Sequence, residues 1–301
     1  MQGTIGKLWK QVWSSATEPL PPNEMSIRTY RFMRLTLAMM AAAIIIAVLL
    51  EYRRAGKFED SISAYYYTAA RPIFTGAMVA IGGFLLALRG RTSLEDNSLN
   101  IAGMLAPIVP LVPPRQASTE TGSVISKVGF PVTDSQKTEL LYNSLWTLSV
   151  VAVLAIVTLL VIGRVKGSGF KLRDWLGVGV AAGVIGLGVL LYRNVDLVHD
   201  NAHGISAGAM FVFLWPAVAI NAHMAPQNPE RVNFRRLYLW VAIVMIAMPG
   251  LCALIGLAVG FDHYVLWIEL GELTPFLVYW VAQSIEGWNV GQVTEANVSL
   301  A

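Results

Sequence analysis

Long apolar stretches that lack charged residues recur along nearly the whole chain of 301 residues. One helical crossing of a bilayer takes about 20 consecutive apolar residues. Charged residues make up only 14% of the chain, against roughly 25% in an ordinary soluble domain, so much of its surface has to contact something other than water. We identify eight segments suited to cross a bilayer, the last of which contains two glutamates: Leu35–Leu50, Pro72–Leu88, Asn97–Pro114, Leu140–Gly163, Trp175–Tyr192, Asn201–His223, Leu237–Phe261 and His263–Ile285. The sequence therefore predicts an all-α, polytopic transmembrane helix bundle.

The distribution of lysine and arginine tests the number of spans, because these residues accumulate in cytoplasmic loops. With eight spans and a cytoplasmic N-terminus, fourteen of the 22 basic residues lie inside and eight lie outside. Asn97–Pro114 is interrupted by four prolines, but omitting it gives seven spans and an even split of the basic residues. We therefore predict eight spans, with both the N-terminus and the C-terminus in the cytoplasm.

The remaining segments surround or interrupt a predicted transmembrane domain at residues 32–288. Residues 1–31 form a cytoplasmic tail, in which apolar side chains recur at helical spacing. This pattern is typical of a short amphipathic helix on the inner membrane face, and a disordered tail is the open alternative. Residues 115–139 are rich in Ser, Thr, Gly and Lys and predict an outer loop, and residues 289–301 form a second cytoplasmic tail.

The composition and the motifs exclude several classes of function. The single cysteine, Cys252, permits neither an intrachain disulfide nor a cysteine metal site. A net charge of +3 without a basic block argues against a nucleic-acid partner. The sequence contains no P-loop, no glycine-rich dinucleotide motif, no H-E-x-x-H and no G-x-S-x-G. Function is therefore expected to reside in polar groups within the spans.

Ionisable residues inside an apolar span are costly, so each of them is a candidate functional residue. Glu269 and Glu272 lie one turn apart on the final segment, and Glu269 is about six residues from its outer end. If the chain has eight spans, three polar features lie near the outer ends of their helices. These are the two glutamates, a histidine that opens the sixth span, and the polar first loop. We therefore predict an outward-facing polar pocket that binds a lipid or another amphiphile, built from Ser61, Ser63, Arg71, His203 and Glu269.

Some of these residues also support other interpretations. Arg71 follows Tyr65–Tyr67, a combination that is also typical of an aromatic belt at the level of the lipid headgroups. His199 and His203 are four residues apart, the spacing by which one helix face presents two metal ligands. Together with Glu269 they would hold zinc in a metal-dependent intramembrane hydrolase or acyl-transfer enzyme. Capping and solvation of a helix start is the other explanation of the histidine pair.

Small residues in the fifth segment support a third function class. Gly179, Gly183 and Gly186 form a small-residue stripe that allows another helix to approach closely. The stripe serves either packing within the bundle or docking of a membrane-protein partner. In the second case the protein is a structural or partner subunit of a membrane complex.

Four short motifs, in this order along the chain, resemble those of a known group of membrane proteins: Ser61–Ala77, Leu99–Gly103, His203–Ala207 and Trp267–Glu269. They are similar to an uncharacterised family of bacterial multipass membrane proteins. More distantly, they resemble the six-span superfamily of damage-regulated autophagy modulators and the Golgi protein that acts in GPI-anchor lipid remodelling. By this resemblance Ser61, Ser63, His203 and Glu269 are the matching positions.

The resemblance implies a six-helix core, a bacterial inner-membrane location and a role that involves membrane lipids. The family passes almost directly from its third span to the span that carries the histidine, whereas about eighty residues intervene here. Residues 140–192 are therefore expected to be an inserted helical hairpin. The six-helix core and the hairpin together give eight spans.

Overall fold

The computed structural model describes residues 22–112, 134–166, 172–225, 233–261 and 263–288. Within these ranges the chain forms helices and no strand. The elements are α2 (Pro22–Ala55), η1 (Ser63–Tyr67), α3 (Arg71–Ala87), α4 (Ser93–Leu105), α5 (Ile108–Leu111), α6 (Asp134–Lys166), α7 (Leu172–Arg193), α8 (Val195–Met224), α9 (Phe234–Val259) and α10 (Tyr264–Glu286). In the described part of the chain, five of these helices are long and apolar enough to cross a membrane, namely α2, α6, α8, α9 and α10. The prediction of an all-α helix bundle is confirmed, and five of its helices have the length and apolar composition that a membrane span requires.

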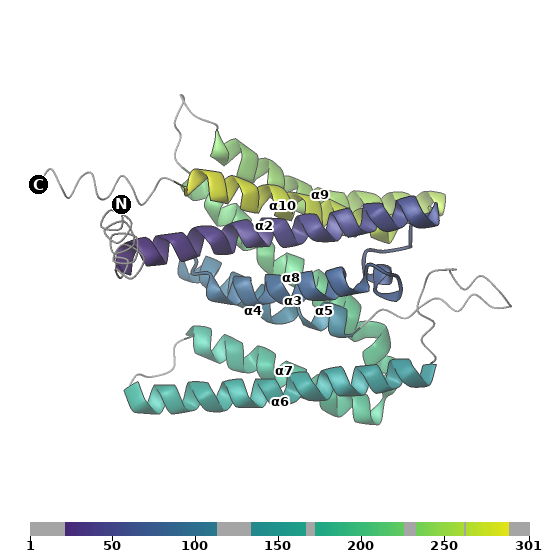
Figure 1. Ribbon diagram of the computed structural model, residues 1–301, viewed down its shortest axis with the longest axis horizontal. Coiled ribbons are helices and arrows are strands. Elements are labelled where there is room, and N and C mark those ends of the chain that lie inside the picture. Colours follow the sequence, from purple (N-terminus) through teal and green to yellow (C-terminus); the bar gives the residue numbers. More distant parts are fainter. Residues whose placement is uncertain (1–21, 113–133, 167–171, 226–232, 262, 289–301) are drawn as a thin grey trace, which may run out of the picture.

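The helices lie side by side along the long axis of the molecule (Figure 1). Helices α2, α9 and α10 form one side of the bundle, α6 and α7 form the other, and α3, α4, α5 and α8 lie between them. Helix α8 contacts α4, α5, α7 and α9, so it connects the two sides. The described residues of the expected hairpin, 140–166 and 172–192, lie in α6 and α7, which run antiparallel side by side (Figure 1).

Two boundaries differ from those expected from the sequence. Helix α2 begins at Pro22, so residues 22–31, which we expected in the cytoplasmic tail, belong to the first helix. Helix α6 begins at Asp134, so the last residues of the expected loop 115–139 are helical. Both extensions are polar, and a helix can continue past its apolar part because its backbone bonds do not depend on the surrounding solvent. The expected amphipathic helix and the tail at 289–301 lie outside the described residues.

The third apolar segment is broken into α4 and α5, as its prolines suggest. Pro107 has no backbone N–H and follows Ala106, the C-cap of α4. At the other end, the Thr92 side chain accepts a 3.2 Å hydrogen bond from Glu95 N and caps the start of α4. Helices α3 and α4 cross closely, since a Cβ added at Gly82 would lie 2.8 Å from the carbonyl oxygen of Gly103.

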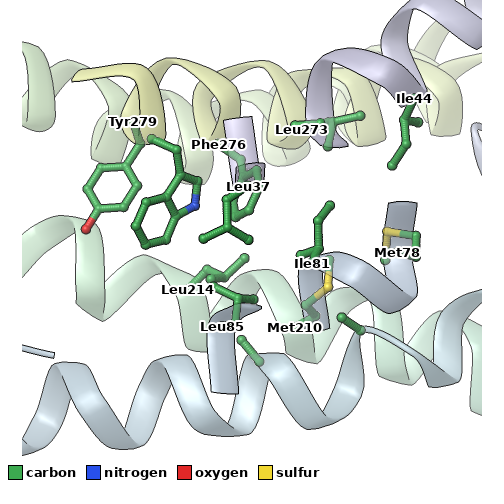
Figure 2. Packing of buried hydrophobic residues seen from close by; sticks show 14 of the residues in the cluster. Leu37, Ile44, Met78, Ile81, Leu85, Met210, Leu214, Leu273, Phe276 and Tyr279 are labelled. Atoms are coloured by element: carbon green, nitrogen blue, oxygen red, sulfur yellow. The ribbon is translucent and has the colours of Figure 1, made fainter. Parts of the chain in front are cut away.

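The apolar core lies between α2, α3, α8 and α10. Figure 2 shows part of it, with side chains that include Leu37, Ile44, Ile81, Leu85, Met210, Leu214, Leu273 and Phe276. Large apolar side chains also cover the outside: Val165 is 81% exposed, Leu257 79% and Val259 78%. An apolar core inside an apolar exterior is the pattern expected of a bundle that contacts lipid.

Candidate functional site

A cavity of about 700 Å³ lies between α8, α9 and α10, with α2, α3 and α5 completing its wall. This volume falls within the range of about 300–1,000 Å³ that is common for small-molecule sites. Most of its lining is apolar: Ile44, Ile62, Phe74, Met78, Ile81, Val109, Ala207, Met210, Phe211, Val212, Leu214, Met245, Ile246, Pro249, Val265, Ile268, Leu273 and Phe276. Among the described residues, the lining side chains with polar atoms are Ser61, Ser63, His203, Trp215, Glu269 and Glu272.

The cavity is bordered by exposed residues at the side of the bundle. Gly204 and Gly208 on α8 line the cavity and are exposed. Val212 on α8 is 68% exposed and Ile246 on α9 is 59% exposed, and both also line it. The mouth is therefore bordered by apolar surface of α8 and α9. Trp215 holds these two helices together, since its Nε1 donates a 3.0 Å hydrogen bond to Ala242 O.

Glu269 fixes the loop that follows α2 over the start of α10. Its carboxylate accepts hydrogen bonds from the backbone N–H of Ile62 and from Ser63 Oγ, the latter at 3.0 Å. Two residues earlier in the loop, Asp60 O accepts a 3.0 Å hydrogen bond from the backbone N–H of Leu266. The loop can turn back in this way because Gly56, the residue after α2, has a φ of 74°. Glu269 and Ser63, both predicted as site residues, therefore lie in direct contact.

His203 is buried on α8 and lines the same cavity. Its Nδ1 lies 2.9 Å from Val109 O and 2.8 Å from Val112 O. A carbonyl oxygen can only accept a hydrogen bond, so Nδ1 carries the hydrogen and donates it to both. These carbonyls lie at the end of α5, where the backbone has no further helical partner. His203 thus fastens the broken third segment to α8.

Arg71 lies outside the cavity lining. Its guanidinium carbon is 4.2 Å from the centre of the Tyr66 ring, and its Nη2 donates a 2.5 Å hydrogen bond to the Tyr66 hydroxyl. Tyr65, Tyr66 and Tyr67 are only 1%, 6% and 7% exposed, so they pack inside the protein and do not form an exposed aromatic belt. Burial raises the pKa of Tyr67 to about 12. Arg71 therefore organises the tyrosine turn, and its predicted role at the rim of the pocket stays a prediction.

Glu272 is the polar lining residue whose importance could not be judged from the sequence. It is only 6% exposed, and its Oε2 has no hydrogen-bond partner among the described residues. It lies one turn after Glu269 on the cavity side of α10. The two glutamates thus share a helix face, but only Glu269 meets the loop. The i, i+3 spacing of two acids in an apolar segment was the available signal.

A second buried polar cluster lies toward the other ends of α8 and α10. It centres on Asn221, which is 0% exposed and which the sequence interpretation passed over. Asn221 Nδ2 lies 2.6 Å from Glu95 Oε1 and 2.9 Å from the Tyr279 hydroxyl, and Asn221 Oδ1 accepts a 2.9 Å hydrogen bond from Gln283 Nε2. Nearby, Glu286 Oε2 accepts a 2.7 Å hydrogen bond from the Tyr238 hydroxyl and lies 3.6 Å from Arg91 Nη2. These mutual bonds join α4, α8, α9 and α10.

The metal hypothesis finds little support in the described residues. Within them, no group of three or more His, Cys, Asp or Glu side chains is arranged to hold a metal ion. The carboxylate oxygens of Glu269 already accept hydrogen bonds from the loop. His203 uses Nδ1 for the end of α5. His199 lies on α8, but its side chain is outside the described part of the structure.

The glycines of α7 differ in how much space surrounds them. A Cβ added at Gly179, Gly183 or Gly186 would meet no atom within 4 Å, so these glycines face open space. A Cβ at Gly188 would lie 2.7 Å from Ser149 Oγ on α6. Gly188 therefore allows the close approach within the hairpin, whereas packing inside the chain does not explain the other three.

Comparison with known proteins finds no matching family model, no similar curated protein and no similar solved structure. The resemblance carried by Ser61, Ser63, His203 and Glu269 therefore stays an expectation from the sequence, and the site rests on its own geometry.

Proposed function

We propose that this protein is a multipass membrane protein that binds a lipid or another amphiphile in the cavity between α8, α9 and α10. The observation that carries the proposal is the shape and chemistry of this cavity: about 700 Å³, apolar on most of its wall, and open at an apolar side of the bundle. The polar groups Ser61, Ser63, His203, Glu269 and Glu272 provide an attachment point for a headgroup, and the remaining wall suits an acyl or alkyl chain.

The proposal includes eight passes, made by five long helices, the shorter apolar helices in α3 and α7, and the broken pair α4 and α5. Both termini are then cytoplasmic, and the resemblance favours the inner membrane of a bacterium. Arg31 lies over the Trp288 ring at 5.5 Å, and Arg34 Nη1 donates a 3.3 Å hydrogen bond to Gln283 O, so basic residues gather where α2 starts and α10 ends. Basic residues concentrate on the cytoplasmic side of membrane proteins.

Single introduced cysteines test this orientation in a Cys252→Ala background. Lys57 follows the end of α2, Ser93 is the first residue of α4, and both are exposed. The end of α2 and the start of α4 lie at opposite ends of the bundle (Figure 1). In intact bacterial cells, a maleimide that does not cross the membrane should label Lys57→Cys and should label Ser93→Cys only after permeabilisation. The reverse pattern would overturn the orientation.

A bulky residue at the mouth tests the binding function. Gly208 lines the cavity, is exposed, and has no atom within 4 Å of an added Cβ, so Gly208→Trp should fold and obstruct the entrance. Gly250 on α9 is also exposed and open but does not line the cavity, which makes Gly250→Trp the matched control. Mass spectrometry of lipids that co-purify with the full chain should show a species lost from Gly208→Trp and retained by Gly250→Trp. Equal lipid content in wild type and both variants would contradict the proposal.

The metal-dependent hydrolase or acyl-transfer hypothesis requires His199, His203 and Glu269 to hold zinc. It is the weaker candidate because the oxygens of Glu269 already accept hydrogen bonds from Ile62 and Ser63. Elemental analysis of the purified full chain decides between the two. Zinc at one equivalent per chain, lost in His203→Ala, would favour the enzyme.

A subunit role is favoured by one specific observation, the open space at Gly179, Gly183 and Gly186. A helix of a membrane-protein partner could approach α7 there. If so, Gly183→Leu should reduce the size of the complex extracted from native membranes, whereas Gly250→Leu should not. An unchanged size for Gly183→Leu would exclude this role.

A further inference from the structure

The polar groups of the cavity are unequal in what they offer to a ligand. Glu269 accepts hydrogen bonds from the loop, and His203 Nδ1 donates to the end of α5. Glu272 is 6% exposed, lines the cavity, and has an Oε2 without a hydrogen-bond partner among the described residues. Glu272 is therefore the acidic group of this cavity that the folded chain leaves available.

The charge of the lining limits which headgroup can bind beside Glu272. Among the described residues that line the cavity, two are glutamates and none is a lysine or an arginine. A phosphate or carboxylate head would enter next to two acids with no cationic side chain to offset the repulsion. A buried carboxylate, in contrast, is stabilised strongly when a cation donates hydrogen bonds to it, because the low-polarity surroundings strengthen the pairing.

The apolar wall determines the rest of the ligand. Phe211 and Leu214 on α8 and Leu273 and Phe276 on α10 line the same cavity as Glu272. An alkyl chain attached to the headgroup would contact this wall and reach the mouth near Gly208. The site therefore suits a molecule with a single cationic head and an apolar tail.

We infer that Glu272 is the headgroup receptor of the cavity and that it selects amphiphiles whose head is a protonated amine. The inference rests on the proposed function, since it assigns a chemical class to the ligand of the same cavity. The ammonium group would donate hydrogen bonds to the Glu272 carboxylate. The Glu269 carboxylate would remain bound to the loop.

Three probes with the same dodecyl tail test this selectivity: dodecylamine, dodecanol and dodecanoic acid. Each is added to the full chain in uncharged dodecyl maltoside micelles, and binding is measured from the rise in unfolding temperature with probe concentration. We expect wild type to bind the amine at least about tenfold more tightly than the alcohol or the acid. Glu272→Gln keeps the shape of the side chain and removes its charge, so it should lose this preference.

Glu51→Gln is the matched control. Glu51 is another buried glutamate, 5% exposed, on α2, where it pairs with Arg54 outside the cavity. This variant should keep the wild-type preference for the amine. It therefore accounts for any general effect of removing one negative charge from the bundle.

The outcomes separate this inference from the proposed function. Equal binding of the three probes by wild type, or an amine preference that survives in Glu272→Gln, overturns the role of Glu272 and leaves amphiphile binding supported. Failure of all three probes to bind wild type overturns both. The ranking of the probes by wild type does not depend on any variant, so it decides the selectivity even if Glu272→Gln does not fold.

Discussion

Ser63 Oγ donates a 3.0 Å hydrogen bond to Glu269 Oε1, although 206 residues separate the two in the sequence. The bond joins the loop after α2 to the start of α10, the last helix described. Because both residues line the cavity, the same contact that fixes the loop also shapes the outer wall of the cavity. The stability of the fold and the shape of the cavity are therefore linked at this point.

Removing the Ser63 hydroxyl should destabilise the protein by about 1–3 kcal/mol, because the buried Glu269 carboxylate loses a donor. Thermal unfolding of Ser63→Ala in detergent measures this. Thr158→Ala is the control, since Thr158 Oγ1 donates only to Leu154 O, one turn back on the exposed face of α6. A loss of the same size in both variants would show that the loop contact contributes nothing specific.

Asn221→Ala should cost about 2–4 kcal/mol, because it leaves Glu95, Tyr279 and Gln283 buried without their shared partner. Asn201→Ala on the same helix is the comparison. Asn221 and Asn201 both donate Nδ2 to the carbonyl one turn back, Ala217 at 2.8 Å and Leu197 at 2.9 Å, but Asn201 is exposed. The exposed site should change stability by less than about 0.5 kcal/mol. Chemical unfolding of both variants checks the difference, and similar losses would disprove the importance of the cluster.

The crossing of α3 and α4 predicts opposite effects at two adjacent glycines. In Gly82→Ala the new methyl group would lie 2.8 Å from Gly103 O and 2.8 Å from the Pro107 ring, so the helices must separate, at a cost of about 1–3 kcal/mol. In Gly83→Ala it would meet nothing within 4 Å, and the better helix propensity of alanine should leave stability unchanged or raised by up to about 1 kcal/mol. Unfolding temperatures of the two variants test this. Equal temperatures would mean that the crossing is loose.

The tyrosine turn predicts a sensitivity to alkaline pH. Burial raises the pKa of Tyr67 from 10.0 to about 12, so the folded protein keeps the phenol proton over a range in which the unfolded chain releases it. The stability from neutral Tyr67 is fully present below pH 10 and is lost as the pH rises to about 12. The unfolding temperature of wild type should therefore fall more steeply over this range than that of Tyr67→Phe. Parallel curves would contradict the prediction.

Much of the helical framework could be predicted because the apolar segments are long and because the basic residues between them are unevenly distributed over the two predicted sides of the membrane. The hairpin of α6 and α7 and the break near Pro107 follow from local sequence. One cavity is lined by four residues predicted from the sequence: Ser61, Ser63, His203 and Glu269. This grouping could be predicted because the eight-span topology puts the corresponding helix ends on the same side of the bundle. The start of the first helix was misplaced because residues 22–31 are polar, and hydropathy marks where a helix is apolar, not where it begins.

The different roles of neighbouring residues could not be predicted. Glu269 and Glu272 are the same residue type and lie one turn apart. Which of the two carboxylates accepts hydrogen bonds from the loop depends only on where the loop packs against α10. Arg71 turned to Tyr66 instead of the cavity because the tyrosines pack inward. Asn221 carries no charge, so nothing in the sequence marked it as the centre of a buried cluster. Each of these outcomes depends on contacts between distant segments.

The mouth of the cavity is bordered by Gly208 and Val212 on α8 and by Ile246 on α9. If the proposed ligand enters by this route, it comes from the hydrocarbon of the bilayer and never has to become a free solute in water. Its occupancy then depends on its mole fraction in the surrounding leaflet. Two ligands with equal intrinsic affinity for the cavity would then differ in occupancy according to how strongly each partitions into the membrane.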